Sequence, residues 1–161
     1  TQFWLSVSWL GDTVPRLIAA GLGIILLLCL RRRQSALFLI SVLLSGISLS
    51  TLIKAWVARP RPGLVPHLDQ VSSMSFPSGH ALNSTLFYLA LALVLAPLLK
   101  QHSTKWGLYG FALVSSLAIG LSRIALGVHW PSDMLASWMI AYGWLALWGT
   151  VAKHYWPHVF N

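Results

Sequence analysis

Five apolar segments, each about twenty residues long, constrain the fold of this chain more than any other feature. A helix of about 20 apolar residues is long enough to cross the ~30 Å hydrocarbon core of a bilayer. The sequence therefore predicts an all-α fold, a polytopic bundle of five transmembrane helices. We expect these helices at about Val14–Leu30, Ser35–Val57, Ser78–Leu99, Trp106–Leu126 and Pro131–Val151.

The segments between the apolar runs indicate where the helices end. Arg31 follows the first run, and Pro60 prevents the second helix from continuing past it. Pro131 is a favourable first residue for the last helix. Residues 1–13 are expected to form an interfacial or partial segment. No repeat or flexible linker divides the chain, so we expect one integral membrane domain over residues 1–161.

The composition also favours a bilayer as the partner, and not a nucleic acid. Hydrophobic residues make up 57% of the chain and charged residues only 9%, whereas soluble domains carry about 25% charged residues. The net charge of +8 would suit nucleic acid, but the 11 Lys and Arg lie at the ends of apolar runs. The single cysteine, Cys29, lies within an apolar run and leaves no intrachain disulfide.

The basic residues predict how the helices are oriented in the membrane. Because successive helix ends alternate between the two faces, one face is expected to carry Arg31 to Arg33, Lys100, Lys105 and Lys153. The positive-inside rule assigns that face to the cytoplasm. The loop 59–76, the start of the third helix and the segment 129–133 then share the opposite face. Polar residues that are distant in the sequence are therefore expected to gather there.

The first polar cluster consists of Lys54, near the end of the second helix, and Arg61 in the run Arg59 to Pro62. The stem of Lys54 is long enough to reach the membrane interface from inside the helix. Two ordinary interface anchors are the alternative explanation for this pair.

The second polar cluster is Pro77-Ser78-Gly79-His80, at the start of the third helix. Ser78 is a good N-cap, and Gly79 allows another group to approach the backbone closely. A helix N-terminus attracts anions, and His80 can exchange a proton near neutral pH. The simpler alternative is a capped helix with His80 at the interface.

The third polar cluster contains Arg123, His129 and Asp133 within a mostly apolar stretch. In the first turn of the last helix, Asp133 can hold one imidazole nitrogen of His129 and leave the other free to attack. Alternatively, Asp133 only complements the helix dipole. The guanidinium of Arg123 is suited to bidentate recognition of a phosphate.

Together these residues suit an anion whose charge is spread over several oxygens, such as a phosphoryl group in transfer. A metal site is not expected: magnesium prefers several carboxylates, and only Asp12 and Asp69 remain. Zinc needs three or four His, Cys or acidic ligands. Two histidines instead suggest covalent catalysis, in which one attacks phosphorus and the other moves the proton.

The three clusters resemble the signature of the type 2 phosphatidic acid phosphatases (PAP2), a superfamily that includes glucose-6-phosphatase and the vanadium haloperoxidases. The signature lies within about residues 54–133, in the usual order and without a substitution. The resemblance implies His129 as the nucleophile that forms a phosphohistidine, Asp133 as its orienting partner and His80 as the general acid. It implies five phosphate-binding residues: Lys54, Arg61, Ser78, Gly79 and Arg123.

The resemblance also implies an activity and a location. We expect a membrane lipid phosphatase on the outer face of a bacterial cytoplasmic membrane, with no metal ion or other cofactor. Its expected substrates are phosphatidate, phosphatidylglycerol phosphate or a polyprenyl pyrophosphate such as undecaprenyl pyrophosphate. PAP2 proteins of membranes usually have six transmembrane helices, so a first, N-terminal helix is expected to be missing from this chain.

Three alternatives compete with this activity. The first is a phosphotransferase, in which a lipid hydroxyl replaces water in attacking the phosphohistidine. The second is a non-catalytic protein that binds or transports an anion, but mere binding does not require a histidine backed by a carboxylate. The third is a vanadium haloperoxidase, which the high hydrophobicity of the chain disfavours.

Overall fold

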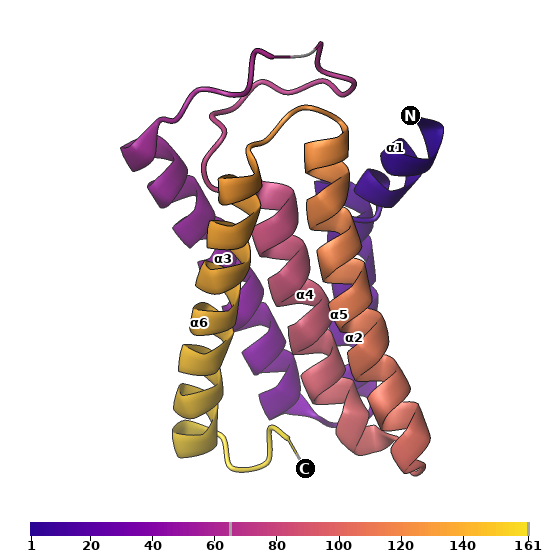
Figure 1. Cartoon of the computed structure of the whole chain (residues 1–161). Coiled ribbons are helices and arrows are strands. Elements are labelled where there is room, and N and C mark those ends of the chain that lie inside the picture. Colours follow the sequence, from indigo (N-terminus) through magenta and orange to yellow (C-terminus); the bar gives the residue numbers. More distant parts are fainter. Residues whose placement is uncertain (65, 161) are drawn as a thin grey trace.

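The computed structural model describes residues 1–64 and 66–160 as a bundle of long helices (Figure 1). The helices are α1 Gln2–Trp9, α2 Thr13–Cys29, α3 Arg33–Val57, α4 Gly79–Leu95, the 3-10 turn η1 Ala96–Leu98, α5 His102–Ala125 and α6 Pro131–Tyr155. No strand occurs within these described ranges. The predicted all-α class is therefore confirmed.

Five stretches are long and apolar enough to cross a membrane, as the sequence predicts. They are Gln2–Cys29, Arg33–Val57, Gly79–Leu98, His102–Ala125 and Pro131–Tyr155. The predicted boundaries are wrong by about one turn in two places, since α5 begins at His102 and α6 continues to Tyr155. The extra turns contain polar and basic residues, so the apolar pattern does not mark them.

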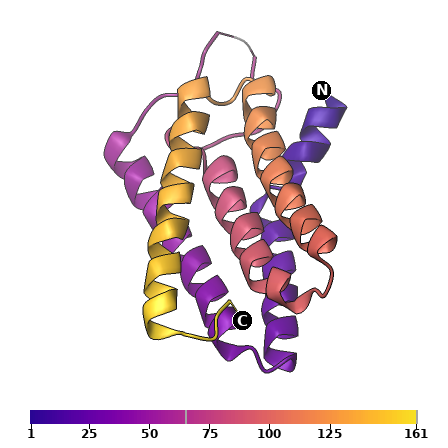
Figure 2. The same cartoon turned by 60° about the horizontal axis from the view of Figure 1, so that its bottom comes forward.

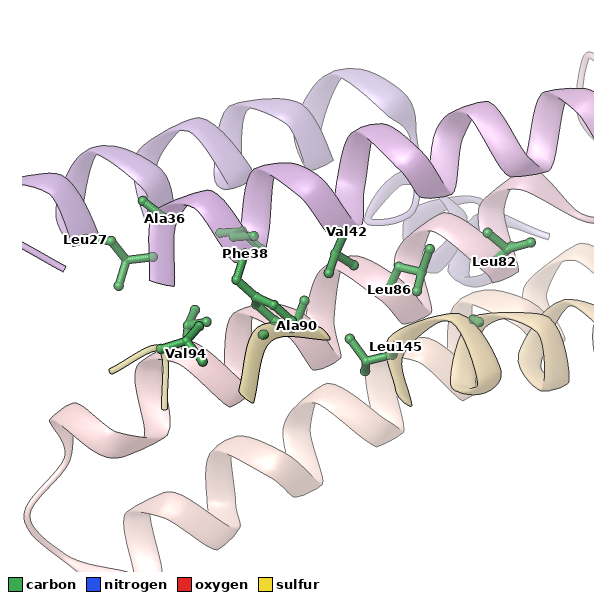
Figure 3. Packing of buried hydrophobic residues seen from close by; sticks show 13 residues of the cluster. Leu27, Ala36, Phe38, Val42, Leu82, Leu86, Ala90, Val94 and Leu145 are labelled. Carbon is green, nitrogen blue, oxygen red and sulfur yellow. The ribbon is translucent and has the colours of Figure 1, made fainter. Parts of the chain in front are cut away.

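Helix α4 lies in the middle of the bundle and packs against α2, α3, α5 and α6 (Figures 1 and 2). Its buried residues form the centre of an apolar cluster that includes Phe38 of α3, Leu86 of α4 and Leu145 of α6 (Figure 3). Helices α3 and α4 approach closely at Gly46, where a Cβ atom would collide with Leu86 Cδ1. Small residues commonly allow such close approach between membrane helices.

The outer faces of the helices carry large apolar side chains that no other part of the described chain covers. Examples are Ile18, Leu22, Leu44, Leu52, Phe111 and Val114, all exposed. A surface of this kind is unfavourable in water and ordinary against lipid tails. The exposed apolar faces therefore agree with an integral membrane protein.

The two ends of the bundle differ in character, as the alternation of helix ends predicts. The α2–α3 turn, the η1–α5 connection and the C-terminus share one end, which carries the basic residues Arg31 to Arg33, Lys100, Lys105 and Lys153 (Figure 1). The connections α3–α4 and α5–α6, together with α1, lie at the opposite end. All three polar clusters belong to these two connections and the helix ends beside them.

Candidate active site

A polar cavity of about 390 Å³ lies at the end of the bundle that carries the α3–α4 connection. Six of the eight predicted site residues line it: Lys54, Arg61, Gly79, His80, Arg123 and His129. The other two, Ser78 and Asp133, are fully buried beside it. The structure therefore brings the three polar clusters together, as their predicted membrane topology requires.

The contacts of His129 assign its tautomer. The guanidinium of Arg61 lies 3.1 Å from His129 Nε2, and a guanidinium can only donate, so Nε2 accepts. The ring proton is then on Nδ1, which faces Asp133 Oδ2 at 3.4 Å. Nε2 therefore carries the lone pair that a nucleophile needs, and in this structure Arg61 donates to it.

Asp133 contacts both the ring of His129 and the start of α6. Its Oδ2 accepts from the Trp130 backbone N–H at 3.1 Å and from the hydroxyl of Ser75. Its Oδ1 accepts from Arg59 Nη1 at 2.7 Å. A fully buried carboxylate with this many donors is held in one orientation. The ring of His129 therefore faces a fixed partner.

The environment of His129 keeps its imidazole neutral. Burial is the largest cause, followed by the positive charges of Arg61 and Arg123, and together they lower the pKa of His129 to about 3. The hydrogen bond and charge of Asp133 act in the opposite direction without cancelling this effect. At neutral pH the ring is therefore unprotonated at Nε2 and able to attack an electrophile.

Arg123 is the most buried cation of the cavity, with only 1% of its surface exposed. Its Nη1 donates to Ser8 Oγ of α1 and to Asp69 Oδ2 at 2.6 Å. Its Nε is buried and has no hydrogen-bond partner among the described residues. A buried donor without a partner is costly, so the site is suited to an acceptor that the protein itself does not supply.

Lys54 and Arg61 line the same cavity and hold the α3–α4 connection over it. Lys54 Nζ donates to the Met74 carbonyl at 2.7 Å, and Arg61 Nε donates to the Ser73 carbonyl at 2.8 Å. Burial and the neighbouring Arg123 lower the pKa of Arg61 from its ordinary value. This crowding of like charges favours an anion between them.

Asp69 lies in the wall of the cavity and pairs with Arg123. Its carboxylate accepts a hydrogen bond from Arg123 Nη1 at 2.6 Å. Burial alone would raise the pKa of Asp69, but the hydrogen bond and charge of Arg123 lower it below its usual value. The carboxylate is therefore ionised and acts as an internal counter-ion for Arg123.

Ser78 and Gly79 have different positions at the start of α4. The hydroxyl of Ser78 accepts from the Ala81 backbone N–H at 3.3 Å, which is the predicted N-cap. The Ser78 backbone N–H donates to Ser137 Oγ at 2.9 Å, and Ser78 does not line the cavity. Gly79 does line it, so the N-terminal end of α4 faces the cavity through Gly79 and His80.

His80 lies between the polar cavity and an apolar groove. The groove has a volume of about 570 Å³, and its walls include Trp9, Ile18 and Leu22. His80 and Asp12 line both spaces. Their side chains meet at 2.6 Å, between His80 Nε2 and Asp12 Oδ1. The polar cavity thus lies directly beside an apolar groove on the outer surface of the bundle.

The side chains around the cavity are poorly suited to bind a metal ion. Across residues 1–64 and 66–160, no group of three or more His, Cys, Asp or Glu side chains is arranged to hold one. The carboxylates of the cavity, Asp12 and Asp69, are each paired with His80 or Arg123. The anion site is therefore built from nitrogen donors.

The sequence prediction missed four residues that contact the site: Arg59, Ser75, Asp12 and Asp69. Arg59 belongs to the run Arg59 to Pro62 of the first polar cluster, but nothing in the sequence pairs it with Asp133 of α6. Ser75 has no charge, and the two acids lie outside the three motifs. The rarity of acidic residues, only 3 in the chain, was the one signal that could have identified Asp12 and Asp69.

Comparisons with known proteins identify the family of this chain. The family model of the PAP2 superfamily matches residues 34–156. Phosphatidylglycerophosphatase B of Bacillus subtilis is 32% identical over 150 residues, which are 86% of this chain and 71% of that protein. The undecaprenyl-diphosphatase BcrC of Bacillus subtilis is 32% identical over 105 residues, 61% of this chain and 48% of that protein.

A solved structure shares the architecture. The crystal structure of a transmembrane PAP2-type phosphatidylglycerolphosphate phosphatase from Bacillus subtilis superposes with a TM-score of 0.87 at 27% identity. The match covers 96% of this chain and 77% of that one. Fold, site and relatives define an integral membrane hydrolase of phosphoric monoesters or diphosphates. The chain belongs to the PAP2 superfamily, in a group of lipid phosphatases.

Proposed function

We propose that this protein releases phosphate from a membrane lipid phosphate or pyrophosphate through a phosphohistidine on His129. The observation that carries the proposal is the position of His80 and Asp12, which line both a cationic cavity and an apolar groove. A lipid phosphate has the same two parts, an anionic head and a hydrocarbon chain. No metal ion is required in this proposal.

In the first step, His129 Nε2 attacks phosphorus and the bond to the lipid oxygen breaks. The guanidinium of Arg61, which contacts Nε2 in this structure, moves onto a phosphoryl oxygen. Lys54 and Arg123 bind the remaining oxygens, and Asp133 stabilises the positive charge that develops on the ring of His129. His80 gives its proton to the leaving lipid oxygen.

In the second step, His80 takes a proton from water, and the resulting hydroxide attacks phosphorus. The bond between phosphorus and Nε2 breaks, inorganic phosphate leaves and His129 is restored as a neutral ring.

The groove supports a lipid substrate and not a soluble sugar phosphate. Its exposed residues Val14, Ile18 and Leu22 belong to the outer face of α2. A hydrocarbon chain lying there would bring its phosphate ester beside His80. The names of the relatives make phosphatidylglycerol phosphate and undecaprenyl pyrophosphate the first substrates to test.

We also propose that the protein lies in a bacterial cytoplasmic membrane with the cavity on the periplasmic or extracellular face. The basic residues at the opposite end of the bundle support this orientation through the positive-inside rule. In a Cys29→Ser background, a cysteine placed at Ser72 should react with a membrane-impermeant thiol reagent in intact cells. A cysteine placed at Ser103 should not; the reverse pattern contradicts the orientation.

The test of function is phosphate release from lipid phosphates and polyprenyl pyrophosphates in mixed detergent micelles, with and without a chelator. His129→Ala should abolish release while the protein stays folded. The control is His102→Ala, at an exposed histidine at the other end of the bundle, and it should keep the activity. Retained activity in His129→Ala, or loss of activity with chelator, contradicts the proposal. Transfer of labelled phosphate to an acceptor lipid instead of water would indicate a phosphotransferase.

A further inference from the structure

The site contains a second histidine–carboxylate pair besides His129 and Asp133. Asp12 Oδ1 lies 2.6 Å from His80 Nε2, although the two residues are 68 positions apart. Asp12 is the N-cap of α2, where an aspartate normally accepts a hydrogen bond from the first turn of the helix. Here the side chain makes no such bond. Its carboxylate is directed to His80 instead.

The turn that carries Asp12 is fixed by three neighbouring helices. From α2, Arg16 Nη1 donates to the Gly11 carbonyl at 2.6 Å, and from α4, the Tyr88 hydroxyl donates to the Leu10 carbonyl at 3.2 Å. A Cβ atom on Gly11 would lie 2.5 Å from Ile119 Cγ2 of α5, so the backbone is pressed against α5. The carboxylate of Asp12 therefore has a defined position.

The pair of Asp12 and His80 also lies between the two spaces that the head and the hydrocarbon chain of the proposed substrate would occupy. Asp12 and His80 are the residues shared by the walls of the apolar groove and of the polar cavity. Across the described parts of the chain, His80 Nδ1 has no hydrogen-bond partner. With Nε2 bound to Asp12, Nδ1 is the nitrogen left to exchange a proton with a reacting oxygen.

We propose that Asp12 is a positioning residue for the general acid His80. Asp12 accepts the Nε2–H bond, fixes the ring, and places a negative charge beside a histidine that must carry an extra proton when it acts as an acid. Nδ1–H then donates its proton to the lipid oxygen as the bond to phosphorus breaks, and Nδ1 later takes a proton from water. This inference rests on the proposed function and extends it to a residue outside the three motifs.

The test compares two leaving groups in the intact protein. A lipid alkoxide is a strong base and needs a proton from His80, whereas nitrophenolate leaves without one. Asp12→Asn should therefore lower kcat/KM for the lipid phosphate by roughly tenfold to hundredfold and leave kcat/KM for nitrophenyl phosphate nearly unchanged. The ratio of the two values reports on proton donation, because kcat/KM covers the steps up to departure of the leaving group.

Two further variants separate this role from a structural one. Asp12→Ser keeps a good N-cap but no charge, so it should show the same selective loss as Asp12→Asn. In a His80→Ala background, Asp12→Asn should cause no additional loss, because Asp12 acts through His80.

Each contrary result is distinct. An equal loss on both substrates would show that Asp12 only supports the fold, and an unchanged lipid rate would show that it does not act on His80. An additive loss in the His80→Ala background would place its action elsewhere. If the unaltered protein releases no phosphate from lipids, it is the proposed function that fails, and not only the role of Asp12.

Discussion

The pairing of Asp69 with Arg123 predicts that this carboxylate competes with the phosphoryl group of the substrate for the guanidinium of Arg123. The carboxylate of Asp69 lies 2.6 Å from Arg123 Nη1, and in the proposed mechanism a phosphoryl oxygen takes the place of this carboxylate on Nη1. A hydrogen bond between charged groups contributes about 1.5–3 kcal/mol. Because the Asp69 side chain is 30% exposed, solvent screening reduces this to about 1 kcal/mol. Asp69→Asn should therefore tighten binding of phosphate or vanadate about fivefold.

The assay is the inhibition constant of vanadate, which adopts the five-coordinate geometry of the reaction, measured at low and high ionic strength. Asp69→Glu keeps the charge and serves as the control, with an inhibition constant close to that of the unaltered protein. The gain in Asp69→Asn should shrink at high salt, because screening weakens partly exposed pairs. Weaker binding of vanadate by Asp69→Asn would refute the reasoning, since Asp69 would then hold Arg123 in its binding position.

Three other changes follow from the same contacts. Arg59→Met removes the guanidinium that donates to Asp133, the carboxylate paired with His129. In a phosphate-release assay, kcat should therefore fall about tenfold with little change in KM. Gly46→Ala crowds Leu86 and should lower the free energy of unfolding in detergent by about 1–3 kcal/mol, whereas Gly107→Ala, with open space around it, should not. Folding lowers the pKa of His129 from 6.5 to about 3. Between pH 6.5 and about pH 3 this histidine is therefore protonated in the unfolded chain and neutral in the folded protein. Stability should therefore decrease as the pH falls from 6.5 towards 3, and less so in His129→Gln.

Much of the fold could be predicted because lipid imposes a simple rule on sequence. A helix that faces hydrocarbon must be apolar over about twenty residues, so the five spans are visible as runs. The ends of α5 and α6 could not be predicted in this way, since His102 and Tyr155 lie among polar residues that continue the helix beyond the apolar core. Hydrogen bonding of the backbone, and not hydropathy, decides where these helices end.

The site could be predicted in part for a related reason. Charged residues within apolar sequence are costly, so Arg123, His129 and Asp133 were conspicuous, and the alternation of helix ends predicted which face they share. Their partners were not predictable from local spacing. Asp12 contacts His80 only because the α1–α2 turn packs against α4 and α5. Such contacts depend on how helices pack, which no short motif encodes.

The central claim is that His129 Nε2 becomes bonded to phosphorus during the reaction. The most direct measurement is to mix the detergent-solubilised protein with a lipid carrying a radiolabelled phosphate, stop the reaction in alkali, and map the label by mass spectrometry. The account predicts a phosphorylated peptide modified at His129, absent from His129→Ala and present in Asp12→Asn. Unlabelled protein during active turnover, or label on His80 instead, would contradict it.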